Sequence, residues 1–165
     1  MTTAALSWSD CRRLLAEALD LPELAFDDAG LAAVAIQGAT LYLQAIDEPE
    51  VALLVLIADL GDPAVGRPER RAALHQAMLM ANLSWREVAG GALALEPDGE
   101  RALLRVRLDL AALDPEALRQ QLYATIDAAE RWAAEFKTLV GASAADDGQA
   151  VPAAAMVAQP PSAFV

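Results

Sequence analysis

The longest uninterrupted run of apolar residues in this sequence, Val51–Ala58, is eight residues long and limits what the chain can fold into. A helix that crosses a membrane needs about 20 such residues, so we expect no membrane insertion. The length of the run and its β-branched residues favour a strand buried on both faces over a helix. The run therefore predicts a sheet in the first half of the chain.

Strand patterns on either side supply the rest of that sheet. Gly30–Gln37 and Ala39–Ile46 flank Gly38, and apolar and polar residues alternate in the second of them. This pattern predicts an antiparallel hairpin with one face more polar than the other. A second hairpin is predicted from Gly91–Glu96 and Arg101–Asp109, which a Pro-Asp-Gly-Glu turn joins.

Three helix patterns separate and flank the strands. The first covers about Ser7–Leu19 with Ser7 as its cap, the second about Glu69–Trp85, and the third runs from Asp114-Pro115-Glu116 to Val140. The order helix, three strands, helix, two strands, helix predicts an α+β domain over residues 1–140, with an antiparallel sheet packed by helices. Residues 141–165 are rich in Ala and Pro and predict a flexible tail.

The second predicted helix is apolar over an unusually wide arc. Leu74, Met78, Ala81 and Trp85 form one stripe at helical spacing, and further large apolar residues widen it. A surface helix needs one such stripe to face its own core. The excess predicts a second apolar partner, for which a symmetric copy of the chain is the simplest candidate. We therefore expect a homodimer with Leu74, Met78, Ala81 and Trp85 in its interface.

The charge balance excludes several partners. Twelve Lys and Arg against 24 Asp and Glu give a net charge of −12. Nucleic acid and anionic membrane surfaces bind through Lys and Arg, so we expect neither as a partner. The N-terminus lacks the layout of a signal peptide, and the single cysteine, Cys11, fits a reducing compartment. Together these features predict a soluble cytoplasmic protein.

The sequence offers few groups for chemistry. A catalytic site needs converging nucleophilic or ionisable side chains, but the one histidine, His75, is interpreted as a packing or interface residue and Cys11 as a buried small hydrophobe. Gly61–Pro68 has the glycine spacing of a phosphate-binding loop, yet Arg67-Pro68 replaces its Lys-Ser/Thr ending. We expect no catalytic residue, no metal site and no cofactor.

Several short stretches, taken in order, resemble one protein family. They are Phe26-Asp27-Asp28-Ala29-Gly30, Leu79-Met80-Ala81-Asn82, Gly91–Glu96, Leu113–Leu118 and Ala129–Trp132. With the order of the elements and the acidic composition, they resemble the class I type III secretion chaperones, the Tir-chaperone family. The resemblance covers Leu6–Val140 and leaves the tail outside it.

The resemblance implies a homodimer in the bacterial cytoplasm that performs no catalysis and serves virulence. It would bind the non-globular N-terminal segment of a secreted effector, keep that segment competent for secretion, and release it at the ATPase of the secretion apparatus. The extended segment would lie in grooves floored by the first helix and the first hairpin, with an exposed sheet edge available for pairing. The expected contacts are Leu14, Leu15, Leu41, Tyr42 and Leu43, with at least one of the first two in the core.

Two other interpretations stay open at this point. A stand-alone homodimeric regulatory or scaffold protein on the same fold would bind a folded partner or none. An enzyme would use acidic residues in a polar cleft. The type of partner separates a chaperone from a scaffold, and a liganded polar cleft would indicate the enzyme.

Overall fold

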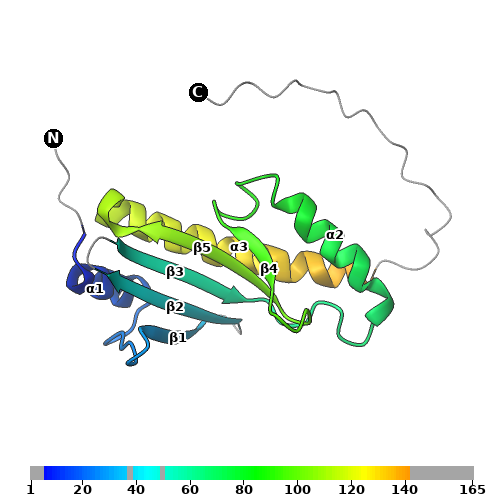
Figure 1. Cartoon of the computed structure of the whole chain (residues 1–165), viewed down its shortest axis with the longest axis horizontal. Coiled ribbons are helices and arrows are strands. Elements are labelled where there is room, and N and C mark those ends of the chain that lie inside the picture. The colour runs from blue at the N-terminus through cyan, green and yellow to red at the C-terminus, as the bar shows by residue number, and fades with distance from the viewer. Residues whose placement is uncertain (1–5, 37–38, 49–50, 142–165) are drawn as a thin grey trace, which may run out of the picture.

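The computed structural model describes residues 6–36, 39–48 and 51–141 (Figure 1). Within these residues, five strands form one antiparallel sheet in the order β1-β2-β3-β5-β4, and three α-helices and two short 3-10 helices complete the fold. The strands are β1 (Leu31–Ile36), β2 (Ala39–Glu48), β3 (Val51–Asp59), β4 (Ala92–Leu95) and β5 (Ala102–Asp109). The helices are α1 (Trp8–Ala18), α2 (Arg71–Ala81) and α3 (Pro115–Gly141), with 3-10 turns at Pro68–Arg70 and Leu110–Ala112. The predicted α+β class and element order are confirmed.

Two of the sequence predictions fall on residues that the structure does not describe. Gly38, the expected hairpin turn, lies outside the described ranges, and so does the expected tail beyond Gly141. Both remain predictions.

Strand β3 lies at the centre of the sheet, between β2 and β5. Four consecutive residues, Leu53–Leu56, are buried, although successive side chains of a strand point to opposite faces. The apolar run that marks this strand in the sequence is therefore buried on both faces at its centre, as predicted.

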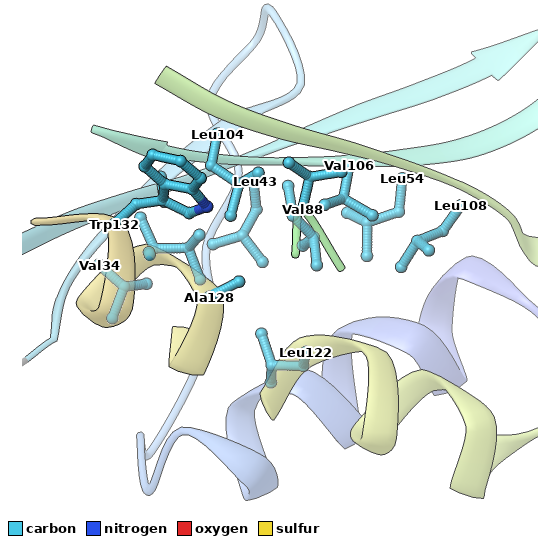
Figure 2. Close-up of a cluster of buried hydrophobic side chains, with 14 of the residues drawn as sticks. Val34, Leu43, Leu54, Val88, Leu104, Val106, Leu108, Leu122, Ala128 and Trp132 are labelled. Atoms are coloured by element: carbon cyan, nitrogen blue, oxygen red, sulfur yellow. The ribbon is translucent and has the colours of Figure 1, made fainter. Parts of the chain in front are cut away.

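The two faces of the sheet differ in what covers them. One face carries Leu43, Leu54 and Val106, which pack with α1 and α3 in the main core (Figure 2). On the same strands, Tyr42, Ile57 and Arg105 form a directly opposed row on the other face. We call this second face the outer face, and no helix among the described residues packs on it as α1 and α3 pack on the first.

Side-chain caps fix the starts of two helices where the sequence predicts them. The Ser7 hydroxyl accepts a hydrogen bond from the Asp10 amide at 3.1 Å at the start of α1. The Asp114 carboxylate accepts one from the Ala117 amide at 2.8 Å at the start of α3. Each cap satisfies a backbone donor that the first helical turn leaves free.

Helix α2 is shorter than the sequence pattern indicates. It ends at Ala81, so Trp85 lies in the following turns and not on the helix. The Asn82 side chain pairs with the backbone of Leu93 in β4, and Trp132 of α3 donates its indole N–H to the Glu87 carbonyl at 2.9 Å. These contacts fold the chain back toward the sheet and end the helix one turn early, which apolar spacing alone does not predict.

Candidate functional site

The two edges of the sheet are protected to different extents. At β4, the Asn82 amide donates to the Leu93 carbonyl at 3.0 Å and its oxygen accepts from the Leu93 N–H at 2.8 Å. At the other edge, the Leu31 N–H donates to the Asp27 carboxylate at 2.8 Å, and the Leu31 carbonyl accepts from the Asp27 N–H at 2.9 Å. In both places a residue outside the sheet occupies the hydrogen-bonding positions of a neighbouring strand.

Beyond Leu31, the edge of β1 is open. Backbone groups of alternate residues point away from the paired strand, so Ala33 and Ala35 face the same way as Leu31. Within the described part of the chain, their N–H and C=O groups have no hydrogen-bond partner. An unpaired strand edge is a template for another extended chain. The first candidate site is therefore the edge of β1 at Ala33 and Ala35.

The outer face lies next to this open edge. Ala33 and Ala35 are exposed on it, and Leu31 and Val51 are its exposed large apolar side chains. Leu53 and Val55 of β3 are buried on this face. The side chains around them are half-buried and belong to three strands; they are Tyr42, Gln44, Ile46, Ile57 and Leu103. The strand edge and the outer face together form a continuous mixed polar and apolar surface.

The residues expected to floor a client groove lie mostly elsewhere. Leu14 and Leu15 of α1 and Leu41 and Leu43 of β2 are all buried in the subunit's own core. Tyr42 alone of the five faces outward, because it alternates with Leu41 and Leu43 along β2. Sequence alternation separates the two faces of a strand but does not say which one the helices cover. Leu41 and Leu43 lie on the covered face of β2, and Leu14 and Leu15 are among the buried residues of α1.

The side chains expected in a dimer interface are likewise divided. Leu74, Met78 and Ala81 are only 1%, 3% and 6% exposed, so they belong to the subunit's own core and have little surface left for a partner. Trp85 is 67% exposed on the loop after α2, with the Arg86 guanidinium 5.3 Å from its ring centre. A single chain does not test dimerisation, which remains a prediction.

A different set of apolar side chains near α2 is free. Leu79, Met80, Leu83 and Trp85 are 70%, 63%, 88% and 67% exposed, and we call them the α2 patch. The signal for them was present in the sequence, since Leu79, Met80 and Leu83 widen the apolar arc of the predicted helix and Trp85 belongs to its predicted stripe. The subunit's core takes one stripe of that arc and leaves the remainder outside.

The surface has several open hollows. One, of about 510 Å³, lies between the ends of β1–β3 and the last turns of α3, where Asp59 and Arg101 form an ion pair. The hydrogen bond to Asp59 raises the pKa of Arg101 above its ordinary value. Another, of about 220 Å³, is lined by Trp8, Arg12, Phe26, Ala45 and Asp47.

The remaining sequence candidates for chemistry are Cys11, His75 and the Gly61–Pro68 segment. Cys11 is fully buried, and burial raises the pKa of its thiol to about 12. The His75 Nε2 atom is buried without a hydrogen-bond partner in the described structure. In the Gly61–Pro68 segment, the Asp62 carboxylate accepts from the Ala64 N–H at 2.8 Å and faces Arg71 at 3.4 Å, so internal contacts hold this loop.

No cluster of three His, Cys, Asp or Glu side chains suited to a metal ion is found within 6–36, 39–48 and 51–141. None of the helices in those ranges has both the length and the hydropathy that crossing a bilayer requires.

An open strand edge, an uncovered sheet face and an exposed apolar patch together define a protein-binding domain. The sequence model of the Tir chaperone protein (CesT) family matches residues 13–133. The chain therefore belongs to the Tir chaperone family, and the predicted resemblance is confirmed. No curated protein sequence matches it.

Solved structures share the fold at low sequence identity. A chain of the crystal structure of the Yersinia pestis type III secretion chaperone SycH with a fragment of YscM2 is 23% identical, with a TM-score of 0.56 over 76% of this chain and 99% of that one. A chain of the ExsC–ExsE complex is 24% identical, with a TM-score of 0.62 over 82% and 97%. A chain of the HopA1–SchA chaperone–effector complex is 19% identical, with a TM-score of 0.55 over 75% and 90%.

Proposed function

We propose that this protein is a type III secretion chaperone of the bacterial cytoplasm. It binds the non-globular N-terminal segment of a secreted effector and keeps that segment competent for secretion, without catalysis of its own. Membership of the Tir chaperone family supports the class. Among the similar folds, one comes from a complex described as a chaperone with its effector.

The open edge of β1 is the observation that carries the binding mode. An extended client segment can pair with the free N–H and C=O groups of Ala33 and Ala35 and continue the sheet. Its alternate side chains would then lie along the outer face beside Tyr42. The edge of β4 is a poorer template, because Asn82 already occupies the backbone of Leu93.

The α2 patch is the proposed contact between two copies of the chain. Large apolar side chains at 63–88% exposure are costly to leave in water, and they lie beside the protected edge of the sheet, away from β1 (Figure 1). A two-fold interface through this patch would leave the β1 edge of each copy free for a client. Release of the client at the secretion ATPase is part of the same proposal.

Purification of the chain from its native host under mild conditions tests the function. We expect one secreted protein to co-purify. Limited proteolysis of the complex should leave a protected N-terminal segment of that protein, which is unfolded when isolated. A folded partner domain, or none, would contradict the chaperone and favour a regulatory or scaffold protein on the same fold. The same complex supplies the client for the variants considered below.

A further inference from the structure

Two arginines of β5 stand together on the outer face. Arg105 and Arg107 are both exposed and alternate with the buried Leu104 and Val106. Side chains two residues apart on a strand are about 6.8 Å apart and point the same way. The pair thus presents two guanidinium groups side by side on one face.

Neither guanidinium is neutralised by a side chain of the described ranges. Among the described residues, Arg105 and Arg107 have no ion-pair or hydrogen-bond partner, although the chain has twice as many acidic as basic residues. By contrast, Arg13, Arg71 and Arg119 each meet a carboxylate.

The acids nearest to the pair on this face have other partners. Asp59 forms the ion pair with Arg101, and Asp109 accepts a hydrogen bond from the Ala111 N–H at 3.0 Å, which caps the 3-10 turn after β5. In a protein of net charge −12, this cationic pair thus has no carboxylate partner among the described residues.

The residues opposite the pair on β3 are apolar. Arg105 lies opposite Ile57, and Arg107 opposite Val55, in the register of β3 and β5. Leu103 precedes the pair on the same face of β5 and is half-buried. Along this face, the outward residues of β5 are apolar Leu103, cationic Arg105 and Arg107, and then acidic Asp109, whose carboxylate caps the following 3-10 turn. The complement of the first three is a segment with an apolar, an acidic and an acidic residue at alternate positions.

We propose that Arg105 and Arg107 select the client: they bind two carboxylates spaced two residues apart in an extended segment that lies over β5 on the outer face. This inference rests on the proposed chaperone function and adds the chemistry of the bound segment. Arginine suits the task, because its planar guanidinium forms paired hydrogen bonds with a carboxylate. The alternate apolar side chains of the segment would contact Leu103 and Ile57.

Isotope-labelled protein and synthetic peptides test the proposal. The probe is Leu-Ser-Glu-Ser-Glu-Ser-Leu, and the comparison peptide carries Gln in place of both Glu. We expect the acidic peptide to shift the backbone amide NMR signals of residues 103–107 and 55–57, with an affinity about fivefold above that of the Gln peptide, as two partly exposed ion pairs would give. Added salt should reduce this preference.

Two double variants separate the pair from general charge. Arg105→Gln with Arg107→Gln should abolish the preference for the acidic peptide. Arg67→Gln with Lys137→Gln removes the same charge from exposed positions in the loop before α2 and in α3. This variant should keep the preference for the acidic peptide. Equal affinities for the two peptides, a preference that survives in the first variant, or no shifts in β5 would overturn the proposal. So would a change in dimer affinity alone, since the arginines would then serve a second copy.

These results are distinguishable from a failure of the chaperone function itself. A client that co-purifies and pairs with β1, with no contribution from Arg105 and Arg107, leaves the proposed function intact and removes the inference. A native partner that is folded removes the proposed function, whatever the peptides do.

Discussion

The side chain of Asn82 takes the place of a strand at the edge of β4. Its amide group satisfies both backbone groups of Leu93 and at the same time anchors the chain where α2 ends. Gly91 completes the junction, because a Cβ there would collide with the Arg105 carbonyl of β5. The Asn and the Gly that contribute to the family resemblance thus each have a physical role, which only the folded chain reveals.

Cys11 carries the clearest pH dependence at the level of one residue. Its thiol has a pKa of about 12 when folded against a reference of 9.0, because burial disfavours the thiolate. Between these values the unfolded chain loses the proton and the folded chain keeps it, so stability falls as pH rises above 9. The slope from this group reaches about 1.4 kcal/mol per pH unit. Urea unfolding from pH 8 to 10.5 measures it.

The matched control for that measurement is Cys11→Ala, which removes the thiol and leaves every other titrating group in place. Its stability should fall less steeply with pH than that of the unsubstituted protein, even if its starting value is lower. Parallel pH profiles would show that the thiol ionises equally easily in both states.

At the level of elements, β1 should behave as a binding edge. Ala33→Pro removes an N–H that points away from β2, so the ladder of the sheet is preserved while one client hydrogen bond is lost. We expect weaker client binding, by about 1 kcal/mol or fivefold, with little loss of stability. Titration of the co-purified client segment by calorimetry checks this.

Ala33→Val is the control for the β1 variant, because it keeps the N–H and has a high strand preference. It should bind the client nearly as well as the unsubstituted chain. If Pro and Val weaken binding equally, the side chain and not the backbone edge is what the client contacts. If neither does, the client pairs elsewhere.

At the level of the whole molecule, two methionines that are two residues apart in α2 separate folding from association. Met80 is 63% exposed in the α2 patch and Met78 is 3% exposed in the core. Met80→Glu should turn a dimer of two 17.4 kDa chains into a folded monomer in sedimentation, because it puts an unpaired charge into the proposed interface. Circular dichroism should remain that of the folded chain.

Met78→Glu is the contrasting variant. It buries a carboxylate in the subunit's own core and should lower the free energy of unfolding by several kcal/mol. A Met80→Glu protein that stays dimeric would move the interface away from the α2 patch. A Met78→Glu protein that dissociates without loss of stability would place that side chain between subunits after all.

The sequence by itself determined the elements and their order, because caps, turns and the period of apolar residues are local signals. Ser7, Asp114 and the run Val51–Ala58 each mark a feature that the structure contains. It also indicated that α2 has more apolar surface than one core needs. The family could be recognised from the same local stretches, taken in order.

The tertiary structure decided which side of each element faces a partner. Leu41 and Tyr42 are neighbours in sequence, yet one is buried and the other lies on the outer face, since only packing chooses the face that α1 and α3 cover. Likewise Met78 is in the core and Met80 outside it. The open edge of β1 and the unpaired arginines of β5 exist only once strands are placed beside one another, because a free hydrogen bond or a free charge is defined by the neighbours it lacks.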